Sequence, residues 1–234
     1  MPDTNPLTFN IGSPIGRYFV IGDIHGCINT LRKLINQLSP EQSDQIIFLG
    51  DYVNKGPDSL AVIEEIISLT DKFSVFCLLG NHDKLLLDVL VNDSDKILRN
   101  KLSELTNDDF FKLSTKDKIR IKNFLQSLPY YYSTKDFLFV HAGFNTESTH
   151  PFEERQPMLN IRDFKYDPKI YKGKKIVHGH NPKPINKIKN AITARSPIIP
   201  LDNGCVYKEK YPELGRLLCL ELNKMELISQ QNCD

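Results

Sequence analysis

The segment QIIFLGDYVNKG, residues 45–56, indicates the fold because an apolar run ends in it abruptly at Gly50 and Asp51. Residues 45–49 have the length and composition of a strand that is buried on both faces. An aspartate at the end of a buried strand is costly unless a partner compensates its charge. We therefore expect Asp51 to have a function.

Two further apolar runs resemble this segment and lie on either side of it in the chain. Residues 17–23 (RYFVIGD) and 73–83 (FSVFCLLGNHD) also indicate buried strands that end in glycine and polar residues. Between the three runs, apolar residues recur at helical spacing in 28–38 and 60–69. This alternation predicts a parallel sheet with crossover helices.

The remaining sequence predicts helices first and strands later. Residues 84–128 are rich in Lys, Asp and Leu and predict two to four helices. We expect them to elaborate a single catalytic domain that spans residues 1–234. A polar loop is expected at 144–172. Strands are expected at 136–143, 174–180, 196–204, 215–222 and 225–228, the last two as an antiparallel hairpin.

The composition excludes several classes of protein. Of 234 residues, 40% are hydrophobic and 25% charged, as in ordinary globular proteins, and a net charge of +1 argues against a nucleic-acid partner. No apolar run approaches the roughly 18–20 residues of a membrane helix, and the N-terminus lacks a hydrophobic signal core. We expect a cytoplasmic protein with no membrane partner. The five cysteines form no CxxC pair, which indicates reduced structural thiols.

Residues able to bind metals gather where the predicted strands end. Five of the six histidines lie in short glycine-containing motifs. The motifs are GDIHG (22–26), GDYVNKG (50–56), GNHD (80–83), HAG (141–143) and HGH (178–180). Each motif alone is weak evidence. Because ligands of open α/β sheets bind at the carboxyl ends of strands, we expect the set to converge on one cleft.

The donor types in these motifs favour a dinuclear metal site. Oxygen and imidazole donors without thiolate suit Mn, Fe, Zn or Ni. Two ions need a bridging carboxylate, and Asp51 is the candidate. Asp23 and His25 would complete one ion, while Asn81, His141 and a histidine of HGH would complete the other. Two such ions lower the pKa of a shared water and clamp a phosphoryl group.

In this order, the five motifs resemble those of the phosphoprotein phosphatase family of calcineurin-like metallophosphoesterases, from about residue 17 to about residue 205. This family includes bacterial serine/threonine phosphatases and symmetrical bis(nucleosyl)tetraphosphatases. The resemblance implies an α/β fold, in which a β-sandwich of mixed sheets is flanked by helices and holds a dinuclear metal site at strand carboxyl ends. It also implies two divalent ions, with Mn the first choice, and direct attack of a metal-bridging hydroxide on phosphorus.

The resemblance also implies roles for individual residues. Six would be metal ligands, namely Asp23, His25, Asp51, Asn81, His141 and His180. His82 matches the general acid, which protonates the leaving alkoxide, a contribution of typically about 10²–10⁴-fold. Arg162, in LNIRDF, matches a residue that grips the phosphate. His178 falls where a strand residue usually lies.

Three positions depart from the family pattern. Asn54 stands where most members have an aspartate that supports the catalytic histidine, Lys55 where they have an arginine, and Asp83 where they have a glutamate. Asn54 can orient His82 but brings no charge. Lys55 keeps the charge but not the forked geometry of an arginine. We therefore expect both residues to affect catalysis.

The substrate follows from these departures and from the flanking sequence. The segments around Asp51 and Arg162 favour a serine/threonine protein phosphatase that hydrolyses phosphomonoesters. Asn54 and Asp83 favour the alternative, a symmetrical dinucleoside tetraphosphate hydrolase. A third possibility is a metal-binding homologue with weakened catalysis. The expected partner is accordingly a phosphoprotein or a phosphorylated small molecule.

Overall fold

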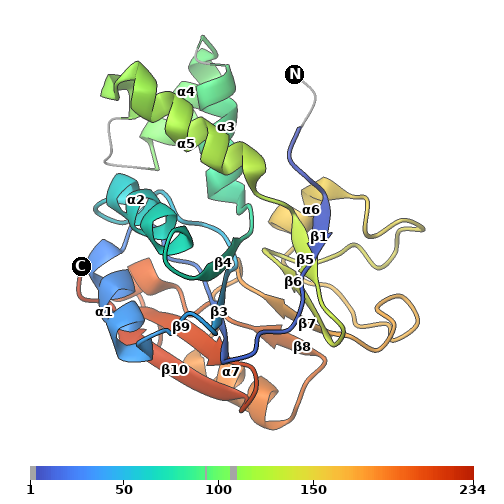
Figure 1. Cartoon of the computed structure of the whole chain (residues 1–234). Coiled ribbons are helices and arrows are strands. Elements are labelled where there is room, and N and C mark those ends of the chain that lie inside the picture. The colour runs from blue at the N-terminus through green and yellow to red at the C-terminus, as the bar shows by residue number, and fades with distance from the viewer. Residues whose placement is uncertain (1–3, 93, 106–109) are drawn as a thin grey trace.

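Two five-stranded sheets form the centre of the computed structural model, which describes residues 4–92, 94–105 and 110–234 (Figure 1). One sheet has the order β10 (Glu226–Gln231), β9 (Arg216–Glu221), β2 (Tyr18–Ile21), β3 (Gln45–Phe48) and β4 (Ser74–Cys77). The other has the order β1 (Thr8–Asn10), β5 (Tyr131–Ser133), β6 (Phe137–Val140), β7 (Lys175–His178) and β8 (Ile198–Pro200).

Both sheets are mixed, as the resemblance implies. Strands β2, β3 and β4 run parallel, and β9 pairs antiparallel with both β2 and β10. In the other sheet β6, β7 and β8 run parallel, while β5 is antiparallel to β6 and parallel to β1. Each sheet therefore contributes three neighbouring strands whose carboxyl ends point the same way.

The central strands β2 and β3 are apolar on both faces because each face has its own partner. Val20 and Ile47 belong to a buried cluster with Phe139 and Val177 of the other sheet. The alternate residue Phe19 lies in a second cluster with residues of α1 (Ile28–Leu38) and α2 (Ser59–Thr70). Since successive side chains of a strand point to opposite faces, one run of apolar residues fills the space between the sheets and the space under the helices.

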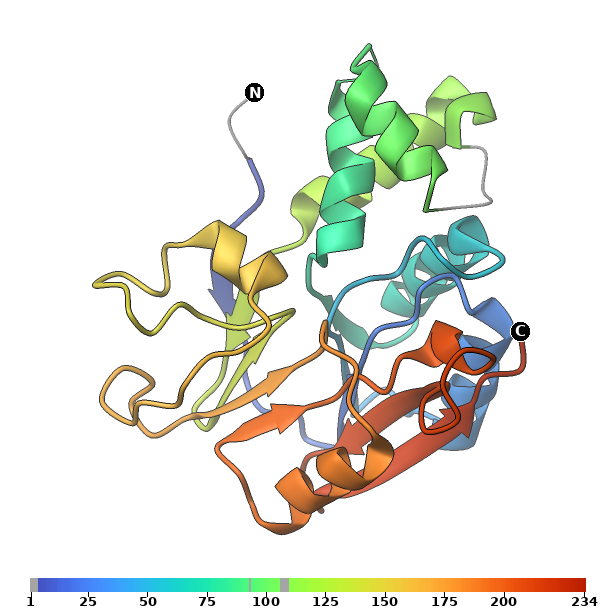
Figure 2. The ribbon, with the colours of Figure 1, turned by 180° about the vertical axis from the view of Figure 1, so that it is seen from behind.

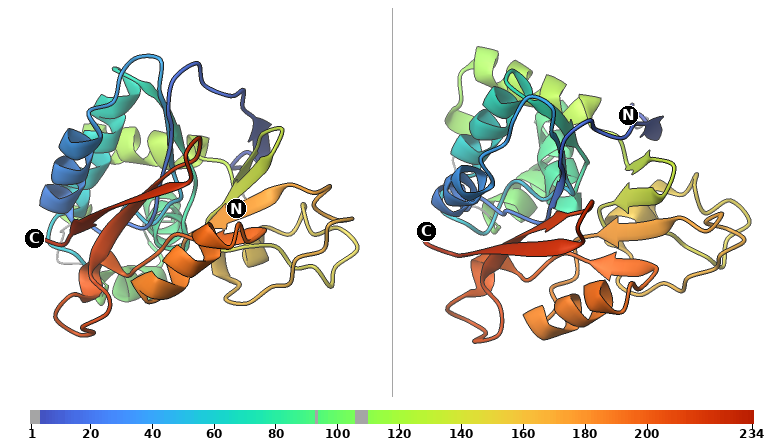
Figure 3. Two further views of the ribbon diagram at one scale, coloured as in Figure 1. Left: turned by 90° about the horizontal axis from the view of Figure 1, so that it is seen from below. Right: turned by 60° about the horizontal axis from the view of Figure 1, so that its bottom comes forward.

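Helices α1 and α2 form where the sequence predicts them, on the side of the molecule away from the loop-rich segment 144–172 (Figure 3). The apolar face of α1 repeats at helical spacing and is buried. The helix ends at Ser39, which has φ 41° and precedes Pro40. At the start of α2, the Asp58 side chain accepts a hydrogen bond from the amide of Ala61.

Helices also occupy the segment 84–128, as predicted, and they lie beyond α2 and the end of β4 in Figures 1 and 2. They are α3 (Asn81–Val91), α4 (Lys96–Ser103), α5 (Thr115–Ser127) and the short η1 (Phe110–Lys112). The carbonyl of Leu105, which follows α4, accepts a hydrogen bond of 2.6 Å from the amide of Lys55. That the whole chain forms one domain stays a prediction.

Five elements lie where no helix or strand was predicted, one of them the short helix η2 (Cys205–Tyr207). Strands β1 and β5 have three residues each, too short for a periodic signal, and form by pairing with each other and with β6. Helix α6 (Arg155–Asn160) lies inside the segment predicted as a loop, and α7 (Ile185–Thr193) packs beside β8. Its Ile188 and Ile192 join the cluster between the sheets, a contact that only the tertiary structure supplies.

The structure also bears on the predictions about membrane helices and cysteines. Within residues 4–92, 94–105 and 110–234, no helix is both long and apolar enough to cross a membrane. The five cysteines are free thiols, four of them buried.

Candidate metal centre

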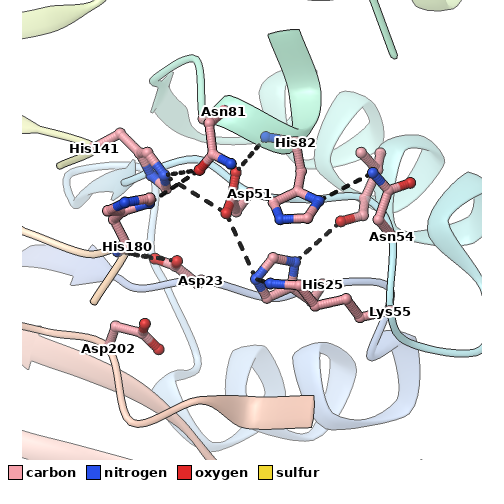
Figure 4. A network of polar contacts seen from close by, with 12 residues as sticks. Asp23, His25, Asp51, Asn54, Lys55, Asn81, His82, His141, His180 and Asp202 are labelled. Atoms are coloured by element: carbon pink, nitrogen blue, oxygen red, sulfur yellow. Dashed lines mark hydrogen bonds and ion pairs between the residues drawn. The ribbon is translucent and has the colours of Figure 1, made fainter. Parts of the chain in front are cut away.

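The carboxyl ends of strands from both sheets converge on one cluster of polar side chains (Figure 4). Asp23 and His25 follow β2, Asp51 follows β3, and Asn81 and His82 begin α3 after β4. His141 and His180 follow β6 and β7 of the second sheet. All six predicted metal ligands thus lie together.

Asp51 stands at the centre of the cluster and is 2% exposed. Its Oδ2 atom lies 3.5 Å from Nε2 of His25 and 3.5 Å from Nε2 of His141. Its Oδ1 atom accepts a hydrogen bond of 2.9 Å from the amide of His82. Asp51 therefore faces a histidine from each sheet.

Asp51 belongs to two groups of potential metal ligands. In each group the candidate donor atoms lie within 4.8 Å of one another. One group contains His25, Asp51 and His82, and the other contains Asp51, His141 and His180. A carboxylate shared by two groups is the arrangement that a dinuclear site requires.

The ring nitrogens of His25 and His141 are oriented by backbone carbonyls. Nδ1 of His25 lies 3.1 Å from the carbonyl oxygen of Val53, and Nδ1 of His141 lies 2.9 Å from that of Leu49. A carbonyl oxygen can only accept, so each Nδ1 carries the hydrogen. The Nε2 lone pairs are left facing Asp51. Metal-binding histidines are commonly oriented by such a bond.

Asn81 and Asp23 occupy different places in the cluster. Oδ1 of Asn81 lies 3.0 Å from Nε2 of His141 and 3.0 Å from Nδ1 of His180, so three donor atoms converge. The carboxylate of Asp23 accepts the amide hydrogen of His180, at 3.0 and 3.2 Å, and it lies outside both groups of candidate ligands.

The backbone around the cluster is strained. Among the described residues, nine other than glycine have positive φ, and five of these belong to the cluster. They are His25, Asp51, Asn54, Lys55 and His180, with φ between 50° and 71°. Such conformations persist only where the surroundings enforce them, and they concentrate at functional sites.

Asp83, which the sequence analysis treats only as a departure from the family pattern, holds the turn of Asp51. Its carboxylate accepts hydrogen bonds from the amides of Asp51 (2.7 Å), Tyr52 (2.9 Å) and Gly80 (2.9 Å). A Cβ atom on Gly80 would lie 2.2 Å from the amide nitrogen and from Oδ1 of Asp51. Glycine is therefore needed at position 80 for this close approach, which the Asp83 carboxylate holds in place. Asp83 is part of the GNHD motif, but the motif alone does not show that its carboxylate contacts the residues after β3.

Burial controls the protonation of the cluster. It lowers the pKa of His141 and of His180 to about 3, so both rings are neutral and keep a lone pair. Burial also raises the pKa of Asp23 and of Asp51, and the charge of Lys55 partly opposes both rises. The nearby carboxylates of Asp202 and Asp51 raise the pKa of Asp23 further. A neutral imidazole is the form that binds metals, and carboxylates with raised pKa values are those that gain most from a nearby cation.

These residues fit two divalent ions. The cluster supplies oxygen and neutral nitrogen donors. Asp51 at its centre belongs to both groups of candidate ligands, and the Nε2 lone pairs of His25 and His141 face it. Cysteine, which would favour softer metals, is absent from both groups of candidate ligands in the described residues.

His82, Asn54 and Lys55 form the other side of the cluster. Nδ2 of Asn54 lies 3.1 Å from Nδ1 of His82, while Oδ1 of Asn54 is buried without a hydrogen-bond partner among the described residues. Burial, then the charge of Lys55, lowers the pKa of His82 to about 3. The Lys55 ammonium lies 2.9 Å from Nε2 of His25. Asn54 thus contacts the predicted acid, and Lys55 contacts a predicted ligand.

A cavity of about 360 Å³ opens over the cluster. Asp51, Lys55 and His82 line it from the centre, and Arg162 lines its wall. That Arg162 contacts phosphate stays a prediction. Asp202, which follows β8, also lines it. Tyr207 and Tyr211 lie in the same wall and were not among the residues predicted for the site.

The family is decided by a match of residues 16–223 to the model of the calcineurin-like phosphoesterases. The chain belongs to this family. The two mixed sheets flanked by helices are the metallophosphoesterase fold. This family implies divalent metal ions, for which the cluster at Asp51 offers the donors.

Curated relatives match about half of the chain. A symmetrical bis(5'-nucleosyl)-tetraphosphatase of Proteus mirabilis is 35% identical over 128 residues, which cover 53% of this chain and 44% of the relative. The enzyme of the same name from Pectobacterium atrosepticum is 39% identical over 129 residues, which cover 53% and 42%. The matched region is thus less than half the length of either relative.

Solved structures match almost the whole fold. A chain described as a candidate diadenosine tetraphosphatase superposes with a TM-score of 0.66 at 23% identity, covering 98% of this chain and 99% of its own. A protein serine/threonine phosphatase from Saccharomyces cerevisiae gives a TM-score of 0.67 at 14% identity, covering 99% and 86%. At such identities these likenesses concern the fold alone.

Proposed function

We propose that this phosphoesterase hydrolyses dinucleoside polyphosphates, with dinucleoside tetraphosphate as the first substrate to test. This reverses the order of the two readings drawn from the sequence, in which a serine/threonine phosphatase came first. The names of the curated relatives support the dinucleotide. The observation that carries the proposal is the contact between Asn54 and His82.

That contact bears on the leaving group. A carboxylate beside Nδ1 would favour a protonated His82, whereas the Asn54 amide brings no charge. Burial, then the charge of Lys55, lowers the pKa of His82, so little of the protonated ring that could act as an acid is present near neutral pH. An alkoxide leaving from phosphoserine needs a proton in the transition state. A nucleoside diphosphate leaves as a phosphate whose own pKa is about 6, so it needs little help. A site in which His82 is seldom protonated therefore suits an anhydride bond.

The remaining residues have compatible roles in this proposal. Asp51 would be shared by two divalent ions, with His25 and Asp23 on one side and Asn81, His141 and His180 on the other. Two ions in such a site lower the pKa of a bound water and offset the charge of the phosphates. Lys55 and Arg162 face the cavity with two positive charges that can bind and orient the polyphosphate chain. Water adds to one phosphorus atom, the P–O–P bond breaks, and a nucleoside diphosphate departs.

The test is the turnover of diadenosine tetraphosphate and of a phosphoserine peptide by the purified protein. Both are measured in parallel with Mn²⁺, Mg²⁺, Zn²⁺ or Ni²⁺, because the metal is a proposal of its own. We expect kcat/KM for the dinucleotide to exceed that for the peptide by at least about 10²-fold. A preference for the peptide would restore the protein phosphatase, and no turnover of either would favour the catalytically weakened homologue.

A further inference from the structure

Tyr207 and Tyr211 form one wall of the cavity in a segment whose role the proposed function leaves open. The segment, residues 204–215, connects β8 to β9 and begins with the short helix η2 (Cys205–Tyr207). Apart from histidines, these two tyrosines are the aromatic residues lining the cavity in the part of the chain that the structure describes. Tyr211 keeps 44% of its surface exposed, although an exposed ring of this size gains by being covered.

The segment is fastened at both ends. Nδ2 of Asn203 donates to the carbonyl oxygens of Lys183 (2.9 Å) and Glu213 (3.1 Å). Gly204 has φ 63°, and a Cβ atom there would lie 2.7 Å from the ring of Tyr207. Tyr211 is held by a hydrogen bond of 3.0 Å from its amide to the carbonyl of Tyr207. The backbone that carries the two rings is therefore held by contacts within the chain.

A continuous series of contacts leads from the metal centre to these rings. Nζ of Lys55 lies 2.9 Å from Nε2 of His25 and 5.6 Å from the centre of the Tyr207 ring. The Tyr207 and Tyr211 rings meet edge to face with their centres 6.1 Å apart. Lys55 thus stands between the candidate metal ligands and Tyr207, and Tyr211 lies one ring further along.

Positive charge accompanies the aromatic wall. Nζ of Lys210 lies 5.5 Å from the centre of the Tyr211 ring, and Arg162 lines the same cavity. Cations beside aromatic rings bind ligands in which phosphates adjoin a flat π system, because the cations pair with phosphate and the rings stack. Two kinds of substrate have this chemistry, namely nucleotides and phosphotyrosine peptides.

The order of the contacts favours a nucleotide. In phosphotyrosine the ring is bonded to the phosphate that reacts, so a ring contact would be expected directly beside the metal ligands. In a dinucleotide the base is separated from the reacting phosphorus by ribose and a further phosphate. In the structure a lysine separates His25 from Tyr207, and the more exposed ring is the more distant one.

The geometry points to a nucleobase subsite in which the Tyr211 ring stacks on the base. In this subsite Tyr207 supports the Tyr211 ring, and Lys210 binds the phosphate that adjoins the nucleoside. This inference rests on the proposed function, since it names the part of the substrate that lies outside the metal centre. It accounts for an exposed tyrosine in a fastened segment.

The experiment compares substrates with and without bases in the variant Tyr211→Ala. We expect KM for diadenosine tetraphosphate to rise about 5- to 100-fold, the range of one lost base–aromatic stack, with little change in kcat. KM for inorganic tetraphosphate, which has no base, should change less than about twofold. Tyr211→Phe keeps the ring and should behave as the wild type. The matched control is Phe9→Ala, since Phe9 is 49% exposed and does not line the cavity.

Binding measurements separate this inference from the proposed function. Calorimetry of the metal-loaded protein with ADP and with pyrophosphate needs no turnover. If Tyr211→Ala weakens ADP binding 5- to 100-fold and leaves pyrophosphate binding unchanged, the subsite stands even if diadenosine tetraphosphate is not hydrolysed. Equal effects on ADP and pyrophosphate, or no effect, would overturn it. A rise in KM for a phosphotyrosine peptide without a rise for the dinucleotide would overturn it in favour of phosphotyrosine.

Discussion

Strand β3 has a buried aspartate before it and another after it, and the two differ in how their charges are compensated. Asp44 and Asp51 are each 2% exposed. Asp44 accepts hydrogen bonds from the amides of Arg17 and Glu41 and from the Arg17 guanidinium. Burial alone would raise the pKa of Asp44, but these bonds outweigh it and lower the pKa. For Asp51, burial prevails over Lys55 and raises the pKa to about 7.

The difference separates a structural charge from a functional one. The chain supplies the counter-charge of Asp44 itself, through a bidentate arginine at the amino end of the strand. At the carboxyl end it surrounds Asp51 with neutral histidines whose lone pairs face it. A buried carboxylate without sufficient counter-charge is destabilising unless a cation binds. A metal-binding role for Asp51 gives this arrangement a physical reason.

The strongest test of the comparison is Asp51→Asn. We expect turnover to fall by more than about 10²-fold, beyond the 10- to 100-fold typical of residues that only support a ligand. The metal content, measured by plasma mass spectrometry, should fall below two ions per chain. The same variant without metal should be more stable than the metal-free wild type, because an uncompensated buried charge is gone. A variant that binds two ions and keeps its turnover would contradict the shared role of Asp51.

His82→Asn tests the other side of the cluster. If protonated His82 is scarce and matters mainly for poor leaving groups, turnover of an alkyl phosphate should fall by about 10²-fold, and that of the dinucleotide by much less. The readout is kcat on both substrates at equal metal content. An equal loss on both substrates would show that His82 acts on binding or on the metals and not on the leaving group.

Asp44→Asn should leave turnover unchanged. It should reduce the free energy of unfolding by about 1–2 kcal/mol near pH 7, because the hydrogen bonds from Arg17 and Glu41 weaken when their acceptor loses its charge. Because the pKa of Asp44 is lowered on folding, its contribution is complete above the ordinary aspartate pKa of about 3.9. It is lost as pH falls through the lower pKa of the folded state. Urea denaturation at pH 7 and pH 3 measures this, and the difference in stability between the two proteins should be smaller at the lower pH. An equal difference at both pH values would mean that Asp44 acts through packing.

Asn54→Asp should have the smallest effect in free energy, and it should raise activity where the other variants at the site lower it. A carboxylate beside Nδ1 should raise the pKa of His82 and make its protonated form available at higher pH. Turnover of an alkyl phosphate should therefore rise several-fold relative to that of the dinucleotide, with the gain largest at acidic pH. The measurement is the ratio of the two kcat values between pH 5 and pH 8. Equal changes on both substrates would remove leaving-group support as the reason for Asn54.

Particular residues show how much could be predicted from the sequence. Strands β2, β3 and β4 and helices α1 and α2 were predictable because their apolar patterns are local and strong. The hairpin of β9 and β10 is confirmed as well. Strands β1 and β5 and helices α6 and α7 were not, because three to nine residues carry little pattern and these elements form against distant partners.

For the site, the sequence by itself determined the donor types and their order, since glycine, acid and histidine at each strand end are local features. Only the tertiary structure decided which donors meet, because Asp51 faces His25 of its own sheet and His141 of the other. It likewise decided that Asp83 holds the Asp51 turn and that Tyr211 reaches the cavity. These contacts join residues far apart in the chain, and their energies depend on burial and distance, neither of which a linear pattern contains.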